Sequence, residues 1–213
     1  MAFLSKLSYN ITIHNMGKPL QIGITGGIGS GKSLVCKIFN ALGTPTYDAD
    51  SRAKMVMTTD GILVEAIKKE FGVLSYDAKG VLNRQHLANS VFNQPDKLKR
   101  LNELVHPRVA LDYKHWVSSQ TNVKYVLKEA ALLFESGSYQ SLDKIIVVTA
   151  PETLRVQRAL IRDPHRSAEQ TKEIIRNQME EEEKTKRADY VIVNDETTLL
   201  IPQVLNLHLQ FIA

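Results

Sequence analysis

Cysteine is almost absent from this sequence of 213 residues, in which Cys36 is the only one. A single cysteine forms no disulfide within its own chain, which is typical of a protein from a reducing compartment. Residues 1–9 also lack the sustained apolar segment and the small-residue cleavage site of an export signal. We therefore predict a cytoplasmic protein.

Long hydrophobic runs are missing too, and none approaches the roughly 18 apolar residues that a membrane-spanning helix needs. The net charge of +4 suits a nucleic acid, but it suits any polyphosphate ligand equally well. Zinc-ligand spacing, aromatic-rich basic strands and recognition-helix patterns are all absent. We therefore expect no membrane partner and no nucleic-acid partner.

A phosphate-binding loop is the clearest feature that the sequence does contain. Residues 26–33 read Gly-Gly-Ile-Gly-Ser-Gly-Lys-Ser and match the pattern G-x-x-x-x-G-K-[ST]. The apolar residues 20–25 ahead of the loop predict a buried strand, and residues 34–42 predict a helix that ends at Gly43. Because strand, loop and helix follow in the order that the motif requires, the sequence indicates a nucleoside triphosphate site.

The residue types of this loop fit that chemistry. Glycines let backbone N–H groups turn towards a phosphate, and the start of the following helix adds partial positive charge. We expect Lys32 to reach the β- and γ-phosphates of ATP, and the Ser33 hydroxyl to complete the coordination of Mg2+. The predicted ATP-binding residues of this segment are Gly27, Ile28, Gly29, Ser30, Gly31, Lys32, Ser33 and Leu34.

Four further apolar runs predict the rest of a sheet. They lie at residues 44–47, 125–133, 145–148 and 190–193, and helical patterns separate them. Apolar strands that alternate with helices predict an α/β fold with a parallel five-stranded sheet, covered by helices on both faces. Ligands bind such sheets at the carboxyl ends of the strands.

The order of these patterns also divides the chain. We predict a nucleotide-binding core at residues 19–50 and 120–213. Residues 51–119 are too many for a simple crossover between two strands and predict a helical insertion.

Four arginines predict a lid over the phosphates. Arg155, Arg158, Arg162 and Arg166 follow one another at intervals of three or four residues, so they would lie on one side of a helix that Pro164 must interrupt or restart. Such a side is either a solvated basic face or part of a closing element. We predict a lid at about residues 155–180 that neutralises the charge developing during phosphoryl transfer.

Missing motifs narrow the reaction. The sequence contains no Asn-Lys-x-Asp motif for reading guanine, and no apolar run ends in the Asp-Glu pair of a hydrolytic ATPase. Asp48 and Asp50 instead follow the second apolar run. One carboxylate there is enough to orient an acceptor hydroxyl and accept its proton, while the other is available to cap the next helix. The sequence thus predicts phosphoryl transfer to a small molecule with a hydroxyl group.

Six motifs occur together along the chain and make the prediction more specific. They are Thr25 to Ser33, Asp48-Ala49-Asp50, Leu104-Val105-His106-Pro107, Leu132-Leu133-Phe134-Glu135, Arg158 to Asp163 and Ala188 to Asn194. In their order and spacing they resemble the dephospho-coenzyme A kinase family from about Leu20 onwards. The resemblance implies a three-layer P-loop kinase fold. It also implies ATP-dependent phosphorylation of the ribose 3′-hydroxyl of dephospho-coenzyme A, which completes coenzyme A.

The same resemblance implies roles for individual residues. Asp50 becomes the base beside the acceptor ribose, and Asp48 becomes a supporting or magnesium-linked carboxylate. Arg158 corresponds to a lid arginine that contacts phosphate, so the expected catalytic residues are Asp50, Lys32 and Arg158. Arg162 follows one turn later and is also assigned to ATP.

Three further positions complete the implied site. Asn194 corresponds to the place where the last core strand turns near the adenine of ATP. The helical insertion corresponds to an acceptor-binding subdomain that includes His106. Glu135 either shapes the acceptor pocket or caps a helix.

The chain departs from the family pattern at several points. Leu34 stands where a threonine is usual, which removes one hydrogen bond to phosphate worth about 0.5–1.5 kcal/mol. Ala131 stands where a proline is usual before Leu132. Residues before Met16 have no counterpart in the family, which indicates either a translation start at Met16 or a disordered N-terminal extension over residues 1–18.

Two other functions remain open at this point. One is a kinase for a nucleoside or a nucleoside monophosphate, which would share the loop, the insertion and the lid. The other is a switch protein that binds ATP and changes shape without transferring phosphate to a small molecule.

Overall fold

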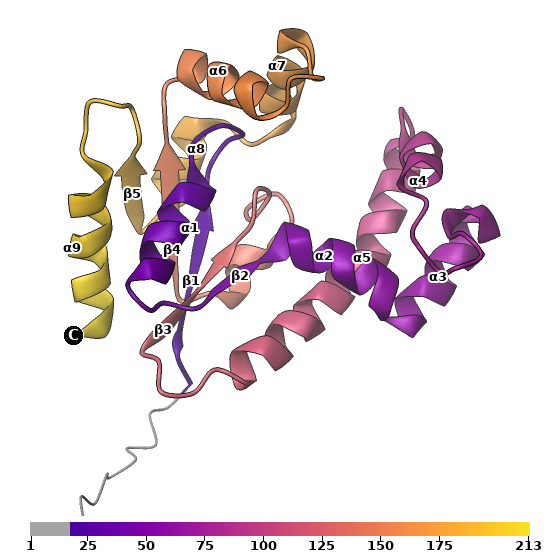
Figure 1. Ribbon diagram of the computed structural model, residues 1–213, viewed down its shortest axis with the longest axis horizontal. Coiled ribbons are helices and arrows are strands. Elements are labelled where there is room, and N and C mark those ends of the chain that lie inside the picture. The colour runs from indigo at the N-terminus through magenta and orange to yellow at the C-terminus, as the bar shows by residue number, and fades with distance from the viewer. Residues whose placement is uncertain (1–17) are drawn as a thin grey trace, which may run out of the picture.

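Five parallel strands form one sheet in the order β2-β3-β1-β4-β5 (Figure 1). This computed structural model describes residues 18–213, so the predicted N-terminal extension lies outside the described residues up to position 17. The strands are β1 (Leu20–Thr25), β2 (Thr46–Asp48), β3 (Tyr125–Glu129), β4 (Lys144–Thr149) and β5 (Tyr190–Val193). The predicted α/β fold with a parallel five-stranded sheet is confirmed.

Two strand boundaries differ from the prediction. β2 begins at Thr46, because Pro45 has no N–H to donate and contributes only its carbonyl, which accepts from the Leu127 N–H at 2.9 Å. The strand extends beyond the predicted end to Asp48. β3 ends at Glu129, and residues 131–136 form turns. Ala130, Leu133 and Phe134 are apolar because they are buried in a core cluster against β4, not because the strand continues.

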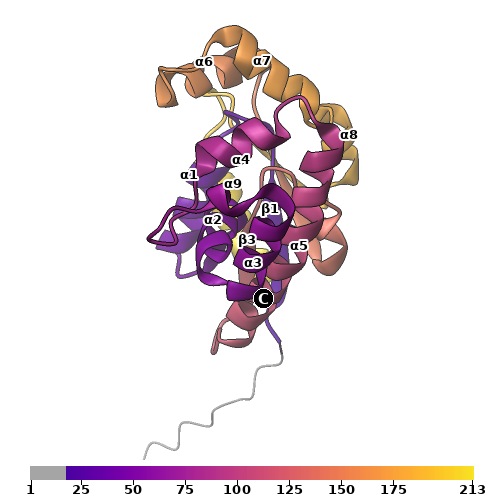
Figure 2. The same ribbon diagram turned by 90° about the vertical axis from the view of Figure 1, so that its right-hand side faces the viewer.

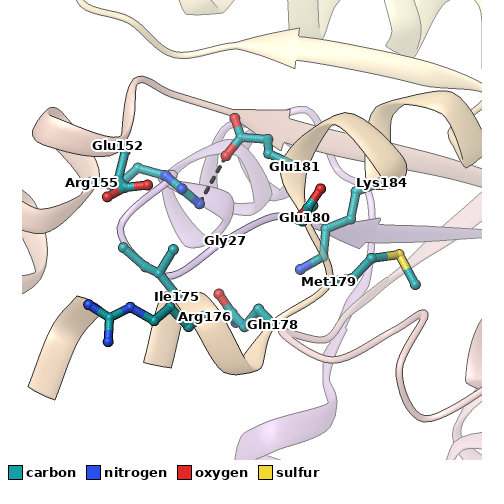
Figure 3. Close-up of a pocket in the computed structure, with 10 residues that line it drawn as sticks. All are labelled: Gly27, Glu152, Arg155, Ile175, Arg176, Gln178, Met179, Glu180, Glu181 and Lys184. Atoms are coloured by element: carbon teal, nitrogen blue, oxygen red, sulfur yellow. Dashed lines mark ion pairs between the residues drawn. The ribbon is translucent and has the colours of Figure 1, made fainter. Parts of the chain in front are cut away.

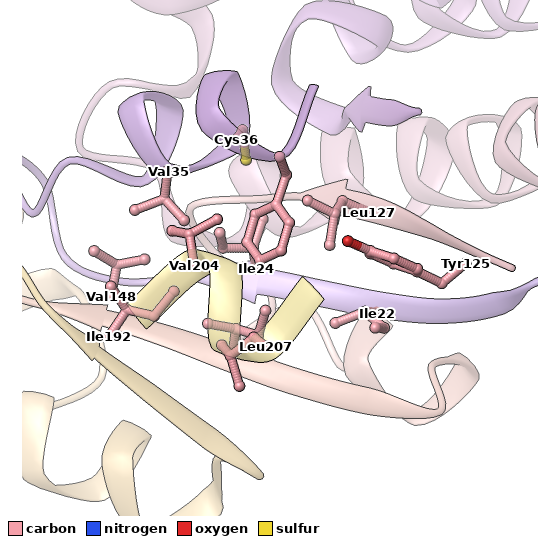
Figure 4. Packing of buried hydrophobic residues seen from close by; sticks show 12 residues of the cluster. Ile22, Ile24, Val35, Cys36, Tyr125, Leu127, Val148, Ile192, Val204 and Leu207 are labelled. Atoms are coloured by element: carbon pink, nitrogen blue, oxygen red, sulfur yellow. The ribbon is translucent and has the colours of Figure 1, made fainter. Parts of the chain in front are cut away.

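One face of the sheet is covered by α1 (Lys32–Ala41) and α9 (Leu200–Ile212). Figure 4 shows Val35 and Cys36 of α1 and Val204 and Leu207 of α9 packed together on the buried strand residues. Ile24 lies in the middle of this cluster and is fully buried. Burial on one side of each helix follows from apolar residues at helical spacing.

The other face of the sheet is covered by the last turns of α5 (Pro95–Ser118) and by the segment after β3. Tyr113 and Val117 of α5 pack on Tyr47 and Val126. Farther along the sheet, α8 (Glu181–Arg187) contacts β4. Helices on both faces give the three layers that a parallel sheet requires.

Four helices lie between β2 and β3 and extend to one side of the sheet (Figures 1 and 2). They are α2 (Ala49–Thr59), α3 (Gly61–Phe71), α4 (Arg84–Val91) and α5, with a short 3-10 turn at Val73–Ser75 and another after β3 at Ser138–Ser141. These helices have a core of their own, which includes Leu63, Ile67 and Val105. The first helix begins at Ala49, and the division of the chain into domains stays a prediction.

The segment predicted as a lid contains two helices, α6 (Glu152–Arg162) and α7 (Ala168–Asn177), which lie at the top of Figure 1. The predicted interruption at Pro164 divides the four arginines between α6 and the segment that follows it. α6 ends at Arg162, because Pro164 disfavours helical backbone at the residue before it. Arg166 lies beyond the helix and pairs with Asp163 at 3.0 Å. Among residues 18–213, no helix combines the length and the apolar character needed to cross a membrane.

The core of the helical segment generates a stability prediction. Ile67 is fully buried in α3, whereas Ile62 of the same helix is 69% exposed. Ile67→Ala should lower the free energy of unfolding by about 2–5 kcal/mol, because it removes apolar contacts and leaves a cavity. Urea denaturation measures this loss, with Ile62→Ala as the matched control expected to change stability by less than about 0.5 kcal/mol. Equal losses in the two variants would contradict the packing described.

Candidate active site

The glycine-rich loop joins β1 to α1 at the carboxyl edge of the sheet. Gly29 and Gly31 have φ angles of 77° and 94°, a conformation that favours glycine. A Cβ atom on Gly29 would collide with the carbonyl oxygen of Arg155, and one on Gly31 would collide with the side-chain amide of Asn194. The loop is therefore held between the first turn of α6 and the residue after β5, with no room for larger side chains.

Two side chains from distant parts of the sequence bind the loop backbone. The Ile28 N–H donates to Oε1 of Gln178 at 3.0 Å. The Asn194 side-chain amide donates to the carbonyl oxygen of Ser30 at 2.8 Å, and the Ser30 side chain is fully buried. Leu34, in the first turn of α1, is 51% exposed. Asn194 directly follows the last strand, β5, and its contact with adenine stays a prediction.

Lys32 lies folded back over the loop. Its Nζ donates to the carbonyl oxygens of Gly26 at 2.8 Å and Gly27 at 3.2 Å. Burial lowers the pKa of Lys32 to about 8, although the nearby charge of Glu129 acts in the opposite direction. A buried ammonium group close to the loop is well placed to attract a polyphosphate, which would restore an ordinary pKa.

Ser33 pairs with an acid that the sequence reasoning missed. Its hydroxyl donates to Oε1 of Glu129 at 2.7 Å. Glu129 is the last residue of β3 and lies opposite Asp48 in the register with β2. A hydroxyl and a carboxylate are oxygen ligands of the kind that Mg2+ prefers, and ATP phosphates and water supply the remaining positions in nucleotide sites. Among residues 18–213 there is no cluster of three or more His, Cys, Asp and Glu side chains that would hold a metal by itself.

Asp48 and Asp50 have different surroundings. The Asp48 carboxylate caps α2, because it accepts from the N–H groups of Asp50 at 3.0 Å and Ser51 at 3.1 Å. It also accepts from the Ser51 hydroxyl. Asp48 therefore has the capping role that the sequence left open between the two aspartates, and its link to magnesium stays a prediction.

The Asp50 carboxyl lies at the wall of a cavity. Burial raises the pKa of Asp50, and the charge of Asp48 raises it further, while Lys32 and Lys54 act against this rise. A carboxyl with a raised pKa that lies close to the phosphate-binding lysine is suited to accept a proton.

The cavity beside Asp50 has a volume of about 550 Å³ and lies between α2, α5 and the segment after β3. Most of its lining is apolar, with a few polar side chains, as is typical of small-molecule sites. His106 lines it, and loss of hydration followed by the charge of Lys128 lowers the pKa of His106. The predicted acceptor residues Asp50 and His106 thus line one cavity, and Asp50 also lies close enough to Lys32 for their charges to act on each other.

A family model described as dephospho-CoA kinase matches residues 20–199 of this chain. The dephospho-CoA kinase of Bacteroides fragilis strain YCH46 is 40% identical over 188 residues, which cover 88% of this chain and 91% of that protein. That of Chlorobium chlorochromatii is 44% identical over 148 residues, or 67% of this chain and 70% of the relative. The chain belongs to the dephospho-CoA kinase family.

Solved structures agree with this membership of the dephospho-CoA kinase family. TT1252 from Thermus thermophilus superposes with a TM-score of 0.81 at 35% identity and covers 92% of this chain and 98% of its own. The dephospho-CoA kinase from Campylobacter jejuni superposes with a TM-score of 0.65 at 26% identity, covering 89% of this chain and 96% of its own.

The predicted lid arginines of this family member differ in their contacts. Arg158 donates to the Asn194 carbonyl at 3.0 Å and pairs with Glu196 at 3.2 Å, so it lies against the end of β5. Arg162, one turn later, is close enough to Lys32 for its charge to contribute to the lowered pKa of that lysine. The roles of both arginines in catalysis stay predictions.

Glu135 is placed at the rim, not in the wall, of the cavity beside Asp50. Its Oε1 accepts from the Met179 N–H at 2.8 Å and pairs with Nζ of Lys184 at 3.1 Å. These contacts lower the pKa of Glu135 against the opposing effect of burial. Glu135 also lines a shallow hollow together with His106. Its contacts with Met179 and Lys184 join this rim to α8 and the residues just before it, and its role in shaping the acceptor pocket stays a prediction.

A second cavity, of about 420 Å³, lies behind the loop between α6, α7 and α8 (Figure 3). Gly27 lies at its wall, directly against the guanidinium of Arg155. Arg155 is 6% exposed and pairs with Glu181 at 2.9 Å, the contact that is dashed in Figure 3. Arg155 thus packs directly against the loop backbone, whereas Arg158 of the same helix contacts the end of β5.

Glu129, Lys128 and Gln178 are site residues that the sequence reasoning missed. Lys128 and Glu129 interrupt an apolar run that was predicted to continue to residue 133, and this break in hydrophobicity was a signal for the end of a strand. Gln178 had no such local signal, because its partner Ile28 is 150 residues away in the sequence.

The contact between Arg155 and Glu181 generates a prediction about the loop. Glu181→Gln removes the charge that balances a buried guanidinium, so we expect a loss of about 1–3 kcal/mol in stability and a higher KM for ATP. Thermal unfolding and steady-state kinetics measure both effects. Glu182→Gln, at an exposed position of the same helix, is the matched control. Identical behaviour of the two variants would show that Arg155 does not need this partner.

Proposed function

We propose that this chain transfers the γ-phosphoryl group of ATP to the 3′-hydroxyl of dephospho-coenzyme A and so produces coenzyme A and ADP. The observation that carries the proposal is that Asp50 lines the 550 Å³ cavity and also lies close enough to Lys32 of the glycine-rich loop for the two charges to act on each other. The loop binds the donor, the cavity accepts the acceptor, and Asp50 lies between the two.

The reaction needs positioning and charge neutralisation more than covalent catalysis. The 3′-oxygen attacks the γ-phosphorus, the bond to the β,γ-bridging oxygen breaks, and ADP leaves. Asp50 accepts the proton of the attacking hydroxyl. Lys32 balances the charge on the β- and γ-phosphate oxygens, and the loop N–H groups orient them.

Ser33 and Glu129 are the residues that would hold Mg2+ with the nucleotide, and their paired oxygens fit such an ion. Bound there, Mg2+ would neutralise part of the negative charge of the nucleotide phosphates. Asp48 lies opposite Glu129 at the same edge of the sheet and adds a second carboxylate beside the proposed ion site.

Closure of residues 155–180 over the phosphates is part of the proposal. Arg162 would then approach the γ-phosphate, and Arg158 would follow from its contact with the Asn194 carbonyl. His106 and Glu135 would border the acceptor on the other side. The single cysteine fits a reducing environment, and a cytoplasmic location stays part of the proposal.

The decisive experiment measures ADP release from Mg-ATP with and without dephospho-coenzyme A and identifies the product by mass. Asp50→Asn should lower kcat about 100- to 10,000-fold, because the amide accepts no proton. Asp48→Asn is the matched variant: asparagine caps helices as well as aspartate does, so α2 should persist. Its loss should be smaller and should be accompanied by a changed dependence on Mg2+. Wild-type protein that folds and binds ATP but makes no coenzyme A would overturn the proposal.

The buried state of Lys32 predicts a pH dependence. Its pKa of about 8 in the ATP-free protein means that the charge is lost at lower pH than for an ordinary lysine. Because kcat/KM for ATP reports the free enzyme, it should fall as pH rises through this value. Lys32→Arg should be less active but should lack this alkaline decline, because its guanidinium stays protonated. A wild-type profile that stays flat across this range would contradict the prediction.

A further inference from the structure

Lys128 is a buried cation that the proposed reaction does not yet use. It is the penultimate residue of β3 and is 4% exposed. Lysine is almost never buried to this degree without a partner, because an ammonium group loses its hydration. This loss of hydration lowers the pKa of Lys128.

The side chain points away from the α1 and α9 layer. Side chains alternate along a strand, so Lys128 shares a face with Val126, which packs against Tyr113 and Val117 of α5. The Lys128 Nζ lies 4.6 Å from the centre of the Tyr113 ring, and the residue lines the 550 Å³ cavity with Asp50 and His106.

No carboxylate of residues 18–213 forms an ion pair with Lys128, and its ammonium donates no hydrogen bond to that part of the chain. Lys184 makes the contrast clear, because it is 1% exposed and pairs with Glu135 at 3.1 Å. The Tyr113 ring offsets only part of the lost hydration of Lys128.

The cavity has a positive charge at Lys128 and a carboxylate at Asp50, and these two groups limit which ligands fit. Lys128 is the only lysine or arginine among the described residues that line it. Asp50 supplies a carboxylate at the end nearest the phosphate-binding loop, and most of the remaining wall is apolar. An acceptor that fits must bring an anionic group close to, but separate from, its reacting hydroxyl.

We propose that Lys128 binds the 5′-diphosphate of the acceptor and has no stabilising role in the ligand-free protein. This inference rests on the proposed function, since dephospho-coenzyme A carries its diphosphate on the same ribose as the reacting 3′-hydroxyl. An ammonium group is a point charge that contacts phosphate oxygens without fixed geometry. Lys128 is therefore a specificity-determining residue: it favours adenosine derivatives with a charged 5′-substituent over plain adenosine.

Lys128→Met tests the inference, with Lys114→Met as the control. Met has a similar shape without the charge, and Lys114 is an exposed lysine on α5 that lines no part of the cavity. Removing a charged contact to phosphate should raise the KM for dephospho-coenzyme A about 10- to 100-fold. kcat should stay within about threefold, because the contact is equal in ground and transition states.

Two further readouts separate recognition of the diphosphate from a general disturbance. The inhibition constant of adenosine, measured against dephospho-coenzyme A, should be the same in wild type and Lys128→Met, because adenosine lacks the diphosphate. The Tm of ligand-free Lys128→Met should equal or exceed that of wild type, because the variant no longer buries an unpartnered charge. Lys128→Arg keeps the charge and should have a KM closer to wild type than Lys128→Met.

Several results would overturn the inference. They are an unchanged KM for dephospho-coenzyme A, a parallel loss of adenosine binding, and a Lys128→Met protein that is less stable than wild type or does not fold. A wild-type protein that makes no coenzyme A would instead overturn the proposed function, so the two failures are distinguishable. Lys114→Met should match wild type in every assay.

Discussion

The close approach of two side chains to the glycine-rich loop is the constraint on which the site depends. Arg155 lies against Gly27 and Gly29, and Asn194 lies against Gly31 and holds the Ser30 carbonyl. These contacts leave no space for a Cβ atom, so the conformation of the loop backbone depends on glycine at these positions. β1 ends just before the loop, and α1 begins at Lys32 just after it. The shape of the loop therefore sets where Lys32 lies in the site.

Charges that lack a full set of partners gather around this loop. Lys32 contacts only backbone carbonyls of the loop, Asp50 has a raised pKa, and Lys128 lies over an aromatic ring with no described acid beside it. Of the three, Lys128 is the most deeply buried, so its charge costs stability in the ligand-free protein and a ligand of opposite charge would relieve that cost. By contrast, the neighbouring buried groups that support the loop, such as Arg155 with Glu181, are paired within the protein. The difference separates residues that bind ligands from residues that hold the site in shape.

Much of the fold and part of the site could be predicted from local patterns. The phosphate-binding loop, five parallel strands and a helical segment after Asp48 each have a signal within a few residues, because strand burial and helix periodicity are local properties. The place after a strand indicated Asp48 or Asp50, the family resemblance implied Asp50, and Asp50 lies at the cavity wall. The ends of β2 and β3 were predicted less well: Pro45 and Leu133 are apolar for reasons of turn geometry and core packing that a hydrophobic run does not distinguish from a strand.

The sequence by itself determined the nucleotide-binding motif, the alternation of strands and helices and the kind of reaction, because each depends on residue types at short spacing. Only the tertiary structure decided which distant groups meet. Ser33 pairs with Glu129 at a separation of 96 residues, and Ile28 binds Gln178 at a separation of 150. It also decided that Lys184 has an acid beside it, whereas Lys128 has none among the described residues. The physical reason is that the burial and pairing of a charged side chain depend on which segments the sheet brings together. The separation of two residues along the sequence does not show whether they meet.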